Sequence, residues 1–175
     1  PGPLGLAAFA STTLLLSLIN INIRHLHNGN IACAMGLAYG GLIQLIAGIC
    51  ELYVDNSFGF TALCSYGGFW LSFSCITIFD SFTAGYTATE LSDVIGLYLL
   101  VWAVFTLLMC ILTVRTTVGF HGMFVCLEIT FILLGAVHLA HDSAGNVHNT
   151  LQKAGGYFGI ITAALAFYNS FAGLA

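Results

Sequence analysis

The chain has 175 residues, of which 59% are hydrophobic and only 6% are charged, and its formal net charge is −4. Soluble domains carry roughly 25% charged residues, so this composition excludes an ordinary soluble domain and favours a protein whose solvent is the lipid bilayer. The scarcity of lysine and arginine, 3 in total, also excludes a nucleic-acid-binding surface.

Charged and polar segments divide the chain into six long apolar stretches. Taken in order, they span residues 4–23, 31–50, 58–79, 94–114, 118–140 and 154–175. Each has about 20 residues, the length that a helix needs to cross a hydrocarbon core of about 30 Å. The pattern predicts an all-α membrane protein: one domain over residues 1–175 that forms a bundle of six transmembrane helices.

Polar residues inside the predicted helices recur seven positions apart, which places both members of a pair on one helix face. The pairs are Thr13 and Asn20, Gln44 and Glu51, Ser65 and Ser72, His121 and Glu128, and Thr162 and Asn169. Lipid cannot satisfy such faces, so we expect them to point into the bundle. They then either line a hydrated path or hydrogen-bond neighbouring helices together.

Glu128 is the only charged residue inside a predicted span. A carboxylate at mid-membrane depth costs about 2.5–3.5 kcal/mol on insertion scales. It must therefore be neutral, hydrogen-bonded or close to water. The functional interpretation is a proton-sensing group or a control on anion entry, and the structural one is a neutral acid bonded to another helix.

Histidines gather at the end of the fifth stretch and after it, where His138, His141 and Asp142 form an H-x-x-H-D pattern followed by His148. Zinc or iron could use such ligands, which gives an intramembrane metalloenzyme as an alternative function. Only one partial histidine box is present, so we favour solvated loop histidines and expect neither a metal nor a cofactor. The six cysteines lie within or beside the spans and are expected to be packing residues.

The chain resembles the acetate uptake transporter family, which includes bacterial succinate–acetate permeases and fungal acetate and ammonia-export-related proteins. The first helix of that family begins with an Asn-Pro-x-Pro-Leu-Gly-Leu motif, and this chain matches it at Pro1, Pro3, Leu4, Gly5 and Leu6. The segments "AMGLAYGGLIQLIAGICE", "FGFTALCSYGGFW" and "AGGYFGIITAALAFYNSFAGL" are similar to the second, third and last helices of the family.

The resemblance implies six-helix protomers in the plasma membrane that assemble as homohexamers, each protomer with its own pore. By analogy, Phe9, Tyr66 and Leu127 form a hydrophobic constriction. The residues expected along the substrate path are Thr13, Asn20, Gln44, Glu51, Ser65, Thr106 and Glu128.

The resemblance implies transport of acetate and similar small monocarboxylates, by an anion channel or by proton symport, and no enzymatic activity. The intramembrane metalloenzyme and a non-transporting sensor or scaffold are the alternatives.

Overall fold

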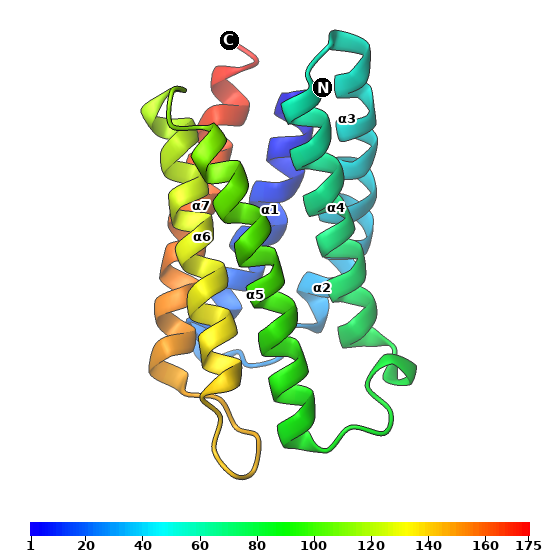
Figure 1. The fold of residues 1–175 in the computed structure, drawn as a ribbon, viewed down its shortest axis with the longest axis vertical. Coiled ribbons are helices and arrows are strands. Elements are labelled where there is room, and N and C mark those ends of the chain that lie inside the picture. The colour runs from blue at the N-terminus through cyan, green and yellow to red at the C-terminus, as the bar shows by residue number, and fades with distance from the viewer.

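The computed structural model describes all residues from Pro1 to Ala175, and every regular element in it is a helix (Figure 1). The long helices are α1 (Gly2–Asn20), α2 (Asn30–Leu37), α3 (Gln44–Glu51), α4 (Ser57–Ile78), α5 (Ala88–Leu112), α6 (Val118–Leu139) and α7 (Asn149–Ala172). Short helical segments are η1 (Ile23–His25), η2 (Ala38–Ile43), η3 (Leu52–Val54) and η4 (Asp80–Phe82). Because η2 joins α2 to α3 without a break, six rods form the bundle, which confirms the predicted fold class.

Two helices begin more than one turn earlier than the hydropathy pattern predicts. Helix α5 begins at Ala88 rather than at residue 94, and α7 begins at Asn149 rather than at residue 154. A capping box starts α5: the Thr87 hydroxyl accepts from the Glu90 backbone N–H, and the Glu90 carboxylate accepts from the Thr87 N–H. Such a cap satisfies the free N–H groups of a polar first turn, so α5 extends beyond the apolar belt. Helix α7 begins after His148 without a side-chain cap.

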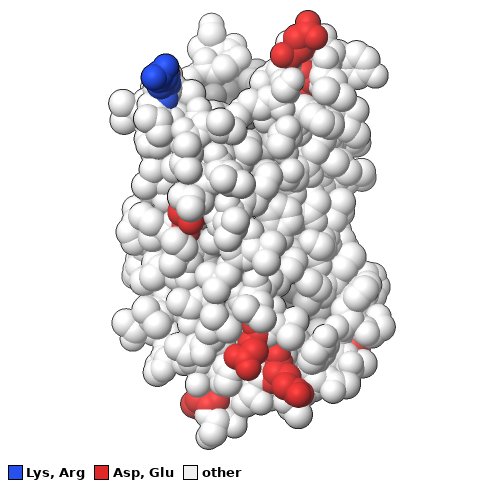
Figure 2. Space-filling view, viewed as in Figure 1, with Lys and Arg blue, Asp and Glu red and all other residues white.

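Five of the six rods are long and apolar enough to cross a membrane. The exception is α7, which is 24 residues long but less apolar, and which packs against α1 and α6. On the face shown in Figure 2, charged side chains lie at the two ends of the molecule, with an acidic side chain at mid-height as the exception. The chain is therefore a multi-pass membrane protein.

The bundle surrounds a buried aromatic core. Helix α1 lies beside α7 and also contacts α3 and η2, while α6 lies between α5 and α7 (Figure 1). Side chains from α1, α4, α5 and α6 meet in one buried cluster that includes Phe9, Tyr66, Trp70 and Leu127. Both chain ends lie at the same end of the bundle (Figure 1), as an even number of antiparallel rods requires.

Segment η2 is a π-helix in the middle of the second rod. Its glycines permit close contact with α1, since a Cβ on Gly40 would lie 2.6 Å from the Thr12 hydroxyl oxygen. Single-turn π-helices widen an α-helix locally and are frequent at functional sites. Gln44 follows η2 directly, so this wide turn sets the direction in which the Gln44 side chain points.

Gly48 offers a test of helix packing. A Cβ at this position would lie 2.7 Å from the backbone nitrogen of Cys64 on α4. Gly48→Ala should therefore separate the two helices and destabilise the protein by about 1–3 kcal/mol, seen as a lower Tm in detergent. The control is Gly68→Ala, because a Cβ on Gly68 has nothing within 4 Å and alanine is the better helix former. Equal Tm values for the two variants would contradict this packing.

Candidate functional site

Two cavities follow one another along α1. The first, about 150 Å³, borders the beginning of this helix at Gly2, Leu6 and Phe9. The second, about 90 Å³, borders its continuation at Phe9, Thr13, Leu16, Ser17 and Asn20. Each has room for more than one water molecule, and the two together span nearly the whole length of α1.

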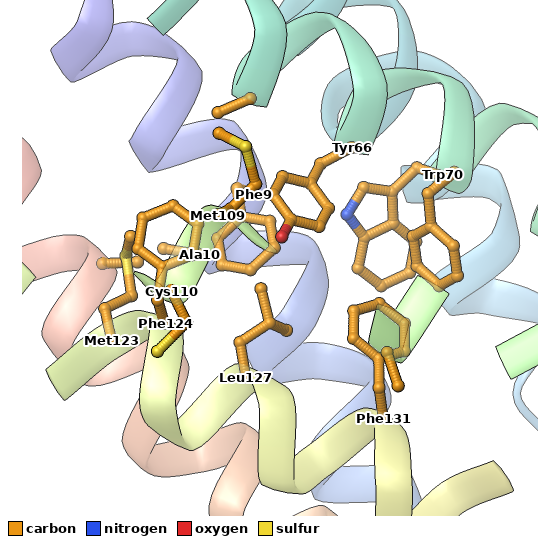
Figure 3. Close-up of a cluster of buried hydrophobic side chains, with 14 of the residues drawn as sticks. Phe9, Ala10, Tyr66, Trp70, Met109, Cys110, Met123, Phe124, Leu127 and Phe131 are labelled. Atoms are coloured by element: carbon orange, nitrogen blue, oxygen red, sulfur yellow. The ribbon is translucent and has the colours of Figure 1, made fainter. Parts of the chain in front are cut away.

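An apolar neck lies between the two cavities. Phe9 and Leu127 line both of them, and Tyr66 lines the first beside Phe9, with ring centroids 5.9 Å apart. All three are at most 5% exposed, and Figure 3 shows their side chains converging from α1, α4 and α6. We call these three residues the neck. The Tyr66 hydroxyl is 2.9 Å from the Thr106 hydroxyl oxygen on α5, which holds the Tyr66 ring in place.

Buried polar groups without hydrogen-bond partners lie beside the cavities. Gln44 is fully buried, lines the first cavity, and has no partner for either its Nε2 or its Oε1 atom. Thr13 Oγ1 and Trp70 Nε1 are unpartnered and belong to residues that line the second cavity. Buried groups of this kind are rare because each costs about 1–3 kcal/mol. These three groups are therefore available to a solute that passes along the cavities.

The far end of the first cavity holds an acid. Glu51, at the end of α3, is 3% exposed and accepts a hydrogen bond from the Asn56 side-chain amide. The Asn56 side-chain oxygen in turn accepts from the Gly59 backbone N–H at 2.9 Å and caps α4. The loop between α3 and α4 thus fixes this carboxylate at the border of the cavity.

Three predicted path residues lie outside the cavity walls. Ser65 lines a separate groove together with Val101 and Trp102, and Thr106 is bonded to Tyr66. Glu128 borders neither cavity, although its Oε2 atom is buried without a partner. By contrast, Thr13, Asn20, Gln44 and Glu51 line the cavities.

The histidines do not form a cluster. His138 is not the loop residue that we expected: it lies in the last turn of α6, lines the second cavity, and its carbonyl accepts from the Ser92 hydroxyl at 2.8 Å. His141 instead contacts Asp93. No three His, Cys, Asp or Glu side chains come close enough together to hold a metal ion, so the geometry gives the metalloenzyme alternative no support. All six cysteines are free thiols.

His141 links the loop after α6 to the start of α5. Its Nδ1 atom donates to the Asp142 carbonyl at 2.8 Å and its Nε2 atom donates to the Asp93 carboxylate at 3.1 Å. The backbone bond to Asp142 and the nearby Asp93 carboxylate raise the pKa of His141 above its ordinary value of 6.5. The protonated form thus stabilises the fold, fully below pH 6.5, and that contribution disappears as the pH rises through the raised pKa.

The Tm of the wild-type protein should consequently decrease as the pH is raised above 6.5, and the decrease should be smaller in His141→Asn. Asp142 does not interfere in this range, because hydrogen bonds from Asn146 and Ala144 lower its pKa below 3.8. Thermal unfolding in detergent at several pH values measures the effect. Parallel curves for wild type and variant would show that the His141 contacts contribute nothing.

Comparison with known proteins identifies the family. The profile described as the GPR1/FUN34/yaaH family matches residues 1–175, the whole chain. The chain belongs to the GPR1/FUN34/yaaH family.

Relatives within the GPR1/FUN34/yaaH family come from fungi and bacteria. The chain is 43% identical to acetate permease A of Emericella nidulans, covering 100% of this chain and 61% of that protein. It is 36% identical to the succinate-acetate/proton symporter SatP of Escherichia coli K12, covering 96% and 84%. A solved structure of the bacterial acetate channel SatP superposes with a TM-score of 0.86 at 35% identity, covering 99% of this chain and 91% of that one. The fold is thus shared with SatP, and the chain spans about three fifths of the length of the fungal permease.

Proposed function

We propose that this protein transports acetate and similar small monocarboxylates across the plasma membrane. The observation that carries the proposal is the row of two cavities, each bordered by unpartnered buried polar groups, on either side of the neck. The names of the relatives support the choice of solute, since they include an acetate permease, a succinate-acetate/proton symporter and an acetate channel.

The chemistry of the path suits a small carboxylate. Hydrophobic constrictions control passage through their wetting, so the neck favours a small, partly apolar solute over hydrated ions. Gln44 offers its amide on one side, and Thr13 and Asn20 offer hydrogen-bonding groups on the other. No lysine or arginine lines either cavity, so the anion is held weakly and released quickly.

Both cavities are lined by side chains of this one chain, which supports a separate path in each protomer. On the family resemblance, we propose that six such units assemble as a homohexamer, each with its own path. The mass of the purified complex in detergent measures the number of copies. A monomeric mass in protein that transports at the full rate would refute the hexamer and show that one protomer is sufficient for transport.

Transport is tested with purified protein in liposomes. Labelled acetate should enter faster than into protein-free liposomes, and unlabelled lactate and succinate should compete according to how well they pass the neck. A pH-sensitive dye inside the vesicles distinguishes a proton-coupled carrier, in which protons enter in fixed ratio to acetate, from a channel. Uptake no faster than in protein-free vesicles would refute the proposal.

Glu128 is the candidate for linking transport to pH. It follows the neck residue Leu127 in the sequence, and its Oε2 atom is buried without a partner. If this carboxyl group favours the protonated substrate, Glu128→Gln should flatten the pH dependence of acetate uptake. Asp80→Asn is the control, because Asp80 is an exposed acid outside the long helices. Unchanged pH dependence in Glu128→Gln would show that this residue has no such role.

A further inference from the structure

We propose that the indole N–H of Trp70 and the hydroxyl group of Thr13 form a binding site for the substrate carboxylate in the second cavity. The inference rests on the proposed transport function and specifies which atoms hold the solute after it has passed the neck. Sequence spacing had suggested Thr13 but not Trp70.

Trp70 is held rigidly with its polar atom free. The side chain is 3% exposed and packs edge-on against Phe69 and Phe73, with ring centroids 5.2 Å and 6.3 Å away. It lines the second cavity, yet Nε1 has no acceptor. Figure 3 shows this nitrogen on the edge of the indole ring that faces Tyr66 of the neck. Buried indole N–H groups usually find an acceptor, so this one is available to a ligand.

The Thr13 hydroxyl group lacks the hydrogen bond within its own helix that other threonines in the bundle form. Threonines in helices commonly donate to the carbonyl four residues earlier. Five in this bundle do so at 2.8–2.9 Å: Thr12 to Ala8, Thr61 to Ser57, Thr77 to Phe73, Thr130 to Cys126 and Thr162 to Phe158. Thr13 is 6% exposed and has no such bond. Its hydroxyl group is therefore not occupied by its own helix, and its residue lines the second cavity.

The donor chemistry selects the ligand. An indole nitrogen can only donate a hydrogen bond, and a hydroxyl group can donate one as well, so the site suits a group with two acceptor oxygens. No aspartate or glutamate lines this cavity, which leaves it poorly suited to ammonium or a metal cation. Apolar walls at Phe69, Leu127 and Phe131 accommodate a short alkyl group. Together these features describe a site for a small carboxylate.

The chain contains two tryptophans, which makes the site directly observable. In protein labelled with ¹⁵N at the indole nitrogens, the Trp70 signal should move saturably as acetate is added. Trp102 lines the groove beside Ser65 and not the second cavity, so its signal should stay in place, and Trp102→Phe assigns the two signals. Sodium chloride at the same concentrations is the control for a general anion effect.

Transport supplies the second measurement. Trp70→Phe keeps an aromatic ring but removes the N–H group, and Thr13→Val keeps the shape but removes the hydroxyl group. Each should raise the KM for acetate by about tenfold, the effect of one lost hydrogen bond to a charged group, while Tm stays the same or rises. An unchanged KM in both variants would overturn the site.

Combining the Trp70 signal with the flux measurement tests the binding site and the transport function independently. A fixed Trp70 signal at saturating acetate, in protein that transports acetate, overturns the site and leaves the proposed function standing. Equal shifts with chloride and acetate overturn the assignment to a carboxylate. A Trp70 signal that moves with acetate in protein that shows no flux supports the site but refutes the transport function.

Discussion

Leu127→Trp should reduce acetate flux to the level of protein-free liposomes. Leu127 is 4% exposed and lines both cavities, so a larger side chain at this position has no space except the connection between them. Passage through a hydrophobic constriction depends on its free width, and the indole ring closes it. Uptake of labelled acetate by liposomes containing the variant measures the result.

The control for this experiment is Ile132→Trp on the same helix. Ile132 is 45% exposed on the outside of the single chain, so the same large side chain there leaves the path untouched. The reverse change, Leu127→Ala, should increase flux through a wider neck while costing about 2–5 kcal/mol of stability. Full transport by Leu127→Trp would show that the solute does not pass between the two cavities at the neck.

Gln44→Met should stabilise the protein and impair transport at the same time. The wild-type amide is fully buried without a partner, a condition that costs about 1–3 kcal/mol, and methionine fills a similar volume without that cost. If the amide binds the carboxylate in passing, its loss removes about 1.5–3 kcal/mol, or roughly 10- to 100-fold in KM.

The predicted rise in stability and loss of transport in Gln44→Met distinguish a binding role from a structural one. A purely structural role for Gln44 predicts that stability and transport change together, whereas a role in binding predicts a higher Tm and a higher KM. Thermal unfolding and concentration-dependent uptake are measured on the same preparation. A higher Tm with unchanged KM would exclude Gln44 from the path.

The number of helices follows from the sequence because the bilayer imposes a length on each apolar stretch. The direction of each helix face is less predictable, because seven-residue spacing places two residues on one face without showing what that face contacts. Thr162 and Asn169 form such a pair, yet both donate to carbonyls of their own helix, at Phe158 and Leu165. Gln44 and Glu51 have the same spacing and line a cavity.

Residues that the sequence pattern misses have a common feature. Trp70 lies in an apolar stretch where a tryptophan looks like any packing residue, and only the structure shows that its nitrogen lacks an acceptor. His138 lies within the predicted stretch 118–140, and only the structure shows that its side chain borders the second cavity. The position of both side chains depends on the rotation of their helices, which is set by packing against neighbouring helices.

The π-helix at Ala38–Ile43 sets the rotation of α3 relative to α2 in the second rod. In a continuous α-helix each residue turns the chain by about 100°, so one residue fewer in this segment would swing Gln44 away from the first cavity while leaving the contacts of α2 as they are. The same rotation would turn Gly48 away from its close approach to Cys64 on α4. The length of this segment therefore sets the side chain presented to the solute and the seating of α3 on α4 together, and insertions or deletions here should be tolerated less than in the loops.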